Sequence, residues 1–496
     1  MKTTILLFIA LSFAASGYSQ SNIGLFDQHT DVGNPTLKGN TVYDAKNQTY
    51  TLSGAGANIW AKSDQFQFLY KKIKGDFIIK ATVHFIGKGV DGHRKIGIMA
   101  RDQLTTGSRY ADGALHGGEP HLTSLQYRLS DGDTTGQVIV ASRFPTEIEF
   151  ERSGNTFILS TAVRGEGYKT VQKEMSLNEE AFVGLFISSH RDSVIERAVF
   201  SNVRITIPPK KGYQPYRDYI PSNLEVMDIA TGHRKVLMTA PGSIQAPNWT
   251  KDGKTLIYNS AEGLMYNYDL QSGSVNQLKT GSAINNNNDH VLSFDGKMIG
   301  LSNYAGDHKS TIYIMPVTGS DNPIKVSSET SGHSYFHSWT KDGKDLIFTG
   351  ERNKEWDIWS INIATKKEKN ITNFPGLDDG AELTPDGKYI YFNSTRTGTM
   401  KIWRMKPDGS QQEQVTFDEF NDWFPHFSPD GKWLVYISFP KDIDPETHPF
   451  YQKVTIKLMP AAGGVPKIVA YLFGGQGSIN VPSWSPDSKK IAFVSN

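Results

Sequence analysis

The second half of the chain repeats one motif six times, and this repeat restricts the fold more than any other feature of the sequence. Each copy has an apolar or aromatic residue, two linking residues, Asp-Gly-Lys or a close variant, and then an apolar run. The repeated aspartates are Asp252, Asp295, Asp342, Asp386, Asp430 and Asp487, at intervals of 43, 47, 44, 44 and 57 residues. A period of about 40–45 residues with four strands per unit is typical of a β-propeller blade.

The repeat also contains the turn chemistry of a β-hairpin. Glycine adopts the positive φ that a tight turn requires, and the preceding aspartate accepts hydrogen bonds from nearby backbone. In the first copy, the turn is predicted to join a strand at 245–249 to one at 255–259. A third strand follows in later copies, as at 357–361 and 401–405, and then a polar fourth strand. The repeated aspartates are therefore interpreted as structural residues.

The two ends of this region are predicted to meet in one blade. The sequence ends just after the second strand of the sixth copy, and two further strands, at 224–229 and 234–238, precede the first copy. These two strands would supply the third and fourth strands of the last blade. The expected architecture is a six-bladed propeller closed by strands from both ends of the domain.

The first half of the chain has a different all-β pattern. Short segments with period-two alternation of apolar and polar residues recur between polar turns, and helical periodicity is scarce, which favours a β-sandwich. Such segments lie at 76–84, 95–101, 147–151, 157–160 and 181–188. The predicted division is a signal peptide at 1–19, a sandwich at 23–207, a proline-containing linker at 208–217 and a propeller at 218–496.

The first residues and the composition indicate the compartment. Lys2 precedes an apolar run at 5–15, and small residues before Gln20 suggest cleavage near Ser19, so we expect a secreted or periplasmic protein. The apolar run is too short to span a bilayer. The net charge of +1 gives no electrostatic case for nucleic acid or for membrane insertion. The sequence has no cysteine, which excludes disulfides and a thiol nucleophile.

The propeller mouth is the expected functional site, because six inner strands bring their first side chains together there. Four residues before each apolar residue of the repeat, the side chains are polar or aromatic. The candidate ligand-binding residues are Gln245, Asn288, Asp289, Tyr335, Asp379, Asp422, Trp423 and Asn480. The candidate catalytic residues are His337, His333, Tyr335 and His290. A long loop at 442–451 is expected to hang over one face of the ring.

Both halves resemble known families. The copies at 427–432 and 484–488 and the Ile-Trp-Arg-Met strand at 402–405 resemble the Pro-Asp-Gly repeats, also called WD40-like, of the TolB propeller. The helix-bearing N-terminal domain of TolB is not found here. The order of strands at 95–101, 151–157 and 183–204 resembles the concanavalin-like jelly roll that often accompanies bacterial glycoside hydrolases. The combination is similar to secreted proteins of Bacteroidetes.

These features lead to three functional hypotheses. The first is binding of a poly- or oligosaccharide at the mouth, with Tyr335 and Trp423 stacking on sugar rings. The sandwich face would contribute through Trp60, Tyr110, His116, His121 and Gln126. The second is a polysaccharide lyase or glycoside hydrolase that uses the mouth. The third is a Tol-type scaffold that binds envelope proteins.

A purely structural interpretation competes with all three, because polar side chains around a water-filled channel also satisfy strand ends. No cofactor is required by any hypothesis. Within the enzyme hypothesis, His290, His333, His337 and Asp289 are candidates for holding a divalent metal.

Overall fold

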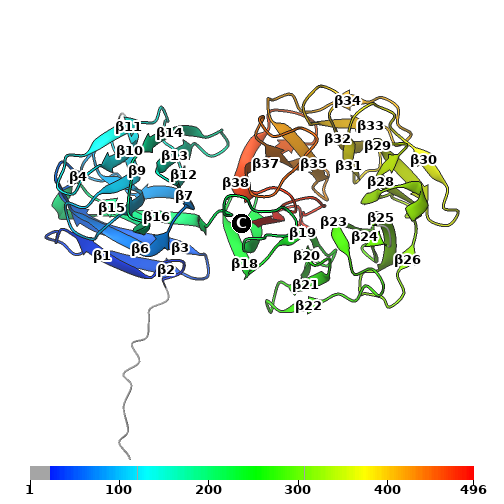
Figure 1. Cartoon of the computed structure of the whole chain (residues 1–496), viewed down its shortest axis with the longest axis horizontal. Helices are drawn as coiled ribbons and strands as arrows, with labels where there is room; N and C mark the ends of the chain where they lie inside the picture. Colours follow the sequence, from blue (N-terminus) through cyan, green and yellow to red (C-terminus); the bar gives the residue numbers. More distant parts are fainter. Residues whose placement is uncertain (1–22, 120, 306–307) are drawn as a thin grey trace, which may run out of the picture.

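The computed structural model describes residues 23–119, 121–305 and 308–496, and the predicted signal peptide lies outside them. Figure 1 shows two β-rich bodies side by side: a sandwich and a ring of blades. The helical structure in the described residues is one 3₁₀ turn, η1 (Glu329–Ser331). The all-β fold predicted from the strand patterns is therefore confirmed. In the described part of the chain, no helix combines the length and the apolar character needed to cross a bilayer.

The first body consists of two seven-stranded antiparallel sheets and a small hairpin. The first sheet has the order β1 (Gln28–Val32), β6 (Phe66–Lys74), β15 (Glu180–Ser188), β8 (Lys95–Arg101), β9 (Tyr110–His116), β10 (Thr123–Arg128), β11 (Gly136–Ile139). The second has the order β14 (Lys169–Glu174), β13 (Thr156–Ala162), β12 (Glu147–Ser153), β7 (Phe77–Ile86), β16 (Arg191–Thr206), β3 (Thr49–Gly56), β2 (Asn40–Asp44). The hairpin pairs β4 (Ile59–Trp60) with β5 (Ser63–Asp64).

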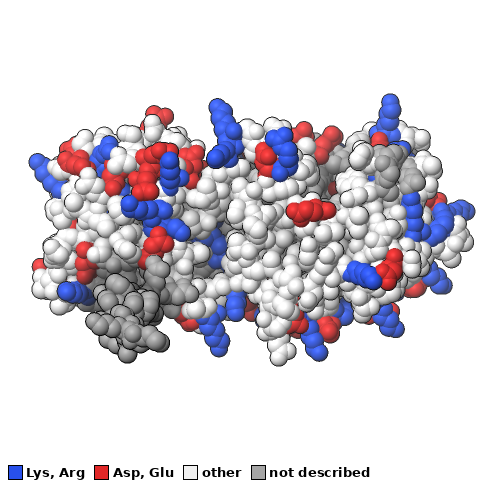
Figure 2. All heavy atoms as spheres, turned by 60° about the horizontal axis from the view of Figure 1, so that its bottom comes forward, with Lys and Arg blue, Asp and Glu red and all other residues white. Residues whose placement is uncertain are grey.

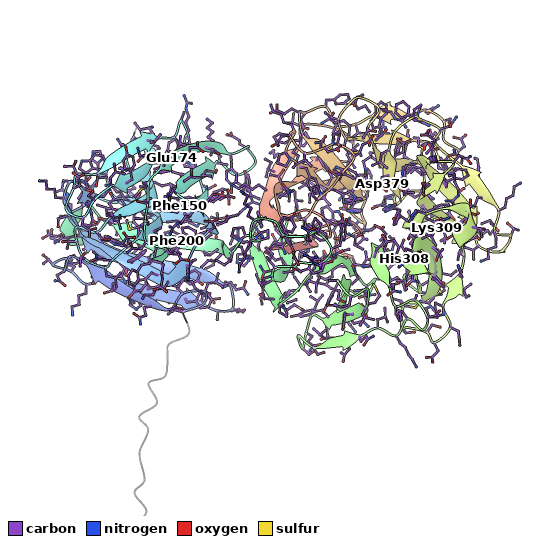
Figure 3. The ribbon with its side chains drawn as sticks, in the orientation of Figure 1. Phe150, Glu174, Phe200, His308, Lys309 and Asp379 are labelled. Carbon is purple, nitrogen blue, oxygen red and sulfur yellow. The ribbon has the colours of Figure 1, made fainter. Side chains whose placement is uncertain are left out.

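The sandwich core explains the period-two pattern, because alternate side chains of facing strands point between the sheets. Phe150 and Phe200 are fully buried there, and Figure 3 shows both inside the sandwich. The two facing sheets agree with the predicted β-sandwich. Its kinship with concanavalin-like domains remains a prediction.

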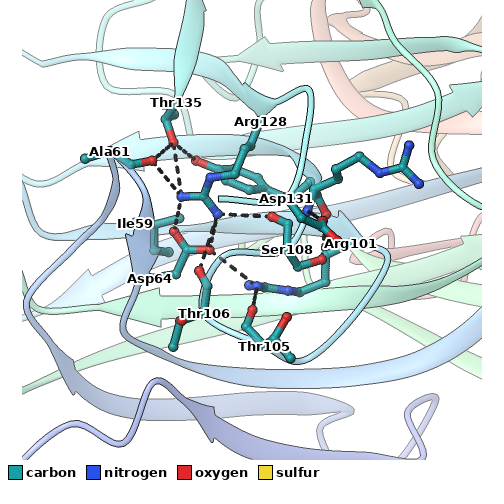
Figure 4. A network of polar contacts seen from close by, with 12 residues as sticks. Ile59, Ala61, Asp64, Arg101, Thr105, Thr106, Ser108, Arg128, Asp131 and Thr135 are labelled. Carbon is teal, nitrogen blue, oxygen red and sulfur yellow. Dashed lines mark hydrogen bonds and ion pairs between the residues drawn. The ribbon is translucent and has the colours of Figure 1, made fainter. Parts of the chain in front are cut away.

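A buried charge network holds the small hairpin against the outer side of the first sheet (Figure 4). The two terminal guanidinium nitrogens of Arg128, Nη1 and Nη2, each donate to the Asp64 carboxylate at 2.8 Å, and Arg101 donates to the same carboxylate at 3.3 Å. All three side chains are fully buried. Because one acid is shared by two bases whose remaining N–H groups bond to backbone carbonyls, the network ties several loops together.

The second body is the predicted six-bladed propeller. Five blades are four-stranded sheets built from consecutive strands. The first two blades are β19 (Ile244–Trp249), β20 (Thr255–Ser260), β21 (Met265–Asp269), β22 (Val275–Gln277), and then β23 (Asn286–Leu292), β24 (Met298–Ala305), β25 (Lys309–Pro316), β26 (Ile324–Lys325). The third and fourth are β27 (Ser334–Trp339), β28 (Asp345–Arg352), β29 (Glu355–Asn362), β30 (Glu368–Asn370), and then β31 (Asp378–Leu383), β32 (Ile390–Ser394), β33 (Lys401–Met405), β34 (Glu413–Gln414). The fifth is β35 (Asn421–Phe427), β36 (Trp433–Phe439), β37 (Gln452–Pro460), β38 (Lys467–Gly474).

The sixth blade closes the ring with strands from both ends of the domain, as predicted. The C-terminal strand β39 (Lys490–Ser495) pairs with β17 (Ser222–Asp228), and β17 pairs with β18 (Arg234–Ala240). The sixth blade has an isolated β-bridge between Trp484 and Ile491 at the position that the innermost strand occupies in the other blades. Closure by strand pairing leaves no unpaired edge at the seam between the two ends of the ring.

The repeated aspartates have the structural role expected of them. In the first blade, Asp252 accepts from the hydroxyl of Thr250 at 2.6 Å and from the amide of Lys254 at 3.1 Å. Gly253 has a φ of 72°, which places it in the left-handed region that glycine tolerates. The same hydroxyl-to-aspartate bond occurs at the equivalent positions of the other five copies.

The two bodies are joined by a buried ion pair at the propeller seam. Arg204 of β16, in the sandwich, and Arg234 of β18 both bind the carboxylate of Glu225, which lies on β17. Ser495 of β39 donates to the same carboxylate at 2.5 Å. Glu225 is fully buried, and the positive charges of the two arginines outweigh the effect of burial and hold its pKa well below the usual value. One carboxylate therefore connects the sandwich to both strands of the closure.

A second contact region lies beside this ion pair. Lys453 of the fifth blade binds Glu149 of the sandwich at 2.9 Å, and Lys80 binds the same carboxylate at 2.8 Å. The rings of Tyr168 and Tyr471 stack across the boundary with centroids 4.5 Å apart. The interface thus combines buried charge pairs with aromatic packing, and it fixes the sandwich against the side of the ring.

Candidate functional site

The candidate site lies at the end of the propeller channel where the inner strands begin. Each inner strand of the five complete blades has a register shift near this end, for example between Asp379 and Glu382 of β31. Ala246, Gly380 and Phe424 occupy equivalent positions and have φ values of 54°, 63° and 53°. Such bulges re-aim side chains relative to a regular strand. In Figure 3, Asp379 lies near the centre of the ring.

A pocket of about 710 Å³ occupies this mouth. The inner strands, the hairpins between second and third strands, the loop at 440–451 and the interdomain linker all contribute to its wall. Carboxamides, aromatic rings and acids dominate the lining, which includes Gln245, Asn259, Asn285, Asn286, Asn287, Asn288, Gln476; Tyr216, Tyr219, Tyr304, Tyr335, Trp356, Phe424; and Glu262, Asp289, Glu355, Asp379, Glu446 with Lys354, His337 and His448. A pocket of this size accommodates a short oligomeric ligand.

His337 and Asp379 form a hydrogen-bonded pair in the pocket wall. The His337 Nε2 to Asp379 Oδ1 distance is 3.0 Å, and the hydroxyl of Thr349 donates to the same oxygen at 2.6 Å. Burial disfavours the charged form of His337, but its bond to Asp379 and the charges of nearby carboxylates outweigh this and raise its pKa. Burial likewise raises the pKa of Asp379, but His337 and Thr349 more than compensate and lower it. The pair is therefore an internally compensated ion pair.

Asp289 shares the pocket, but the compensation from its neighbours is smaller than the effect of burial. Its side chain is 6% exposed and accepts from the amide of Asn287 at 2.8 Å. Burial raises its pKa to about 6; the charge of His337 and the bond from Asn287 lower the value and the charge of Asp379 raises it. Asp289 is thus a carboxylate at neutral pH that would gain from a cation placed beside it.

An aromatic wall stands on the side of the third blade. The rings of Tyr335 and Trp356 are stacked, with centroids 5.9 Å apart and planes 20° apart. The His333 ring contacts both, with centroids 5.7 Å from Tyr335 and 6.0 Å from Trp356, and the Tyr304 ring meets Tyr335 edge-on at 6.5 Å. Burial raises the pKa of Tyr335 well above the usual value, so this phenol stays protonated and does not suit the role of a base.

Six residues selected from the sequence meet in the pocket wall: Gln245, Asn288, Asp289, Tyr335, His337 and Asp379. The other five lie elsewhere. His333 packs against Tyr335 and Trp356. Asp422 is fully buried among Lys401, Lys457 and Ser438. Asn480 is buried, and its side-chain oxygen accepts from the amide of Gly477.

His290 lies deeper in the channel. It is fully buried, it contacts Asn248 at 3.0 Å, and burial lowers its pKa to about 3, so it remains neutral. Among the described residues, no group of three or more His, Asp or Glu side chains is arranged to hold a metal ion. The metal-binding arrangement considered for the mouth histidines and Asp289 is therefore not formed.

Trp423 does not reach the pocket because another segment covers it. The long loop of the fifth blade places His448 against its ring, with centroids 4.5 Å apart, and Trp423 is fully buried. Phe424 and His448 line the pocket in its place. The sequence showed that this loop is long, but not that its histidine packs on the inner strand.

Several other pocket residues were not selected from the sequence. Tyr304 and Trp356 lie in hairpins, Gln476 precedes the innermost segment of the sixth blade, and Tyr216 and Tyr219 belong to the linker between the two bodies. The presence of Tyr216 in the predicted linker was a usable signal in the sequence, and the structure shows that its side chain is 69% exposed.

Within the described part of the sandwich, the candidate residues of its face do not form an open aromatic platform. Tyr110, His116 and Gln126 are buried, and Trp60 is partly covered, with the Lys95 ammonium 5.5 Å from its ring centroid. His121 is half-buried and contacts Phe144. Charged residues of both signs are interspersed over the face of the molecule shown in Figure 2.

The similarity to known proteins covers the propeller part of the chain. The family model described as the TolB beta propeller domain matches residues 291–446. The chain is 40% identical over 274 residues to an uncharacterized protein of Agrobacterium fabrum, covering 55% of this chain and 92% of that protein. A solved structure of a putative TolB from Agrobacterium tumefaciens is 40% identical, with a TM-score of 0.53, and the match covers 56% of this chain and 99% of that one. TolB from Acinetobacter baumannii is 16% identical with a TM-score of 0.40, over 66% and 79% of the respective chains.

Proposed function

Because the chain belongs to the family of TolB-like β-propeller proteins, we propose that it is a scaffold of the cell envelope that binds a segment of a partner polypeptide at the propeller mouth. Within this proposal the protein is periplasmic or secreted after loss of residues 1–19. The sandwich at 23–207 and the propeller at 218–496, joined by the linker at 208–217, act as its two domains.

The observation that carries this proposal is the set of carboxamides around the pocket. Gln245, Asn288 and Gln476 come from three different blades, and four asparagines follow one another at 285–288. A carboxamide offers one N–H₂ donor and one carbonyl acceptor, which is the complement of a peptide group. The Nδ2 of Asn288, in the pocket wall, has no hydrogen-bond partner among the described residues. The carbonyl of a bound peptide is a partner of the kind that this N–H₂ group lacks.

Selection from a random peptide library tests this proposal. The immobilised full-length protein should enrich a family of related peptides at pH 7, and their affinity should fall about fivefold for each hydrogen bond lost in Asn288→Ala or Gln245→Ala. Asn362→Ala, at the end of β29 and outside the residues that line the pocket, is the matched control and should bind normally. Failure to enrich any peptide, or equal binding by all variants, would contradict the proposal.

Oligosaccharide binding is the second candidate, and the stacked rings of Tyr335 and Trp356 favour it. Flat aromatic faces pack on the apolar faces of sugar rings, and carboxamides also pair with hydroxyls. The same immobilised protein separates the two candidates: neutral or acidic oligosaccharides that displace no peptide and cause no thermal shift would exclude this alternative.

A further inference from the structure

The mouth has more acidic than basic groups. Among the described lining residues, Glu262, Glu355 and Glu446 lie exposed at the rim, and Lys354 is the one lysine or arginine. Inside, the charge of Asp379 is balanced by His337, as described above. The carboxylate of Asp289 has no ion pair with any described residue. The excess of negative charge is therefore concentrated on Asp289, inside the cavity.

Aromatic rings line the cavity that contains this carboxylate. Tyr304, Tyr335 and Trp356 line the same cavity as Asp289. The negative charge of Asp289 contributes to the raised pKa values of both tyrosines. Ring faces attract cations through their quadrupole, and tryptophan is the strongest of the three ring types. A carboxylate beside a stack of rings is an environment suited to an organic cation.

The chemistry of the pocket also distinguishes between kinds of cation. A small divalent ion needs several oxygen ligands at short distances, and one partly bonded carboxylate does not supply them. An ammonium or guanidinium group is less demanding, because it combines one charge-assisted hydrogen bond with contacts to aromatic faces. The unpartnered amide of Asn288, which is 2% exposed, lines the same cavity and can accept and donate beside the bound group.

We propose that the mouth recognises a basic side chain, lysine or arginine, of the partner segment and holds its cationic end between the Asp289 carboxylate and the rings of Tyr335 and Trp356. This inference rests on the proposed function and adds the chemical identity of the residue that is recognised. The carboxamides bind the backbone of the segment, and Asp289 with the aromatic wall selects the side chain.

The peptides selected from the random library test the inference. They should contain a lysine or arginine at one fixed position, and replacing that residue with glutamine should weaken binding about 10- to 100-fold. Asp289→Asn, which keeps the shape and removes the charge, should cause the same loss and make the glutamine replacement nearly silent. Glu262→Gln removes the same charge at the rim of the same pocket and should weaken binding less than about threefold.

A second variant and a folding control complete the test. Trp356→Leu keeps an apolar side chain and should weaken binding about 3- to 30-fold. Thermal unfolding of each variant establishes that it is folded. Peptides that bind tightly without a conserved basic residue, or that bind Asp289→Asn as well as the parent, would overturn the inference while leaving peptide binding intact.

A thermal-shift experiment with small molecules tests the inference if no peptide is enriched. Nα-acetyl-lysine methylamide should raise the melting temperature of the protein, and the isosteric norleucine derivative should not. The lysine-dependent shift should vanish in Asp289→Asn and persist in Glu262→Gln. Absence of any difference between the two compounds would overturn the inference on its own.

Discussion

Asp289 shows how one residue can be suited to binding at the expense of stability. An aspartate whose pKa is raised in the folded state is held there in its charged form at a cost, and the cost disappears when the group is protonated in both states. For Asp289 the difference between the ordinary value of 3.8 and about 6 corresponds to about 3 kcal/mol. The cost is absent below pH 3.8 and complete above about pH 6. Binding sites often retain such unfavourable groups.

Asp289→Asn should therefore stabilise the protein near neutral pH. The expected gain is up to about 3 kcal/mol at pH 7, and it should shrink toward zero as the pH falls from 6 to below 4, because the parent aspartate then becomes neutral. Urea unfolding at a series of pH values measures the difference. Glu262→Gln, an exposed change of the same kind, should stay within about 0.5 kcal/mol of the parent. A pH-independent difference would contradict the interpretation.

At the scale of the strand, the closure of the ring depends on one buried acid. Glu225 on β17 neutralises Arg204 and Arg234, and it accepts a bond from Ser495 on β39. Because its pKa is lowered in the folded state, its stabilising contribution is present above the unfolded value of 4.5 and is lost as the pH falls through the lower folded value. Protonation of Glu225 at low pH is therefore expected to weaken the blade that closes the ring.

Glu225→Gln should destabilise the propeller strongly, because it leaves two buried guanidinium groups without a countercharge. Breaking a buried pair by removing one partner costs about 3–5 kcal/mol. Urea unfolding at pH 7 gives this value directly. The control is Glu180→Gln, which removes an exposed partner of Lys72 and should cost less than about 1 kcal/mol. Similar losses in the two variants would show that the buried network is not important for closure.

The repeats made the strands of the propeller predictable from the sequence. Local insertions limited how much of the candidate site could be predicted. Five of the six copies have the same aspartate-glycine turn, and the sixth has Asp487-Ser488 in its place. The number of blades followed from the spacing of these turns, and the closure followed from the two strands that precede the first copy. The packing of His448 on Trp423 has no periodic signal, because it depends on one loop of the fifth blade and its tertiary contacts. Gln245, Asn288 and Asp379 were found by their repeat position, whereas Trp356 and Tyr216 came from hairpins and linker outside the repeat.

At the scale of the whole molecule, the sandwich and the propeller share buried charges. The pairs between Arg204 and Glu225 and between Lys453 and Glu149 cross the boundary, and the side chain of Gln48 makes two bonds to the backbone of Val236. No sequence pattern predicts these contacts between the domains, because each joins residues that are distant in the chain and have no distinctive local sequence. Domains joined in this way are expected to unfold together.

Calorimetry of the full chain should therefore show one unfolding transition. Its calorimetric and van't Hoff enthalpies should agree more closely than those of two independent domains would. In Glu225→Gln the sandwich should melt apart from the propeller, and two transitions should appear. Two separate peaks in the parent protein would mean that the interface does not couple the domains.

The strand that closes the ring also sets an order of events during synthesis. Strand β17 is made early, yet Lys490 of its partner β39 lies 262 positions after Asp228. Until then β17 is an open edge that can pair with the wrong strand or with another molecule. The sandwich is complete before β17 is made, and N-terminal domains generally fold first. Arg204 and Gln48 are then already in place to bind β17 and β18. The sandwich can therefore keep these strands from incorrect pairing until β39 has been synthesised.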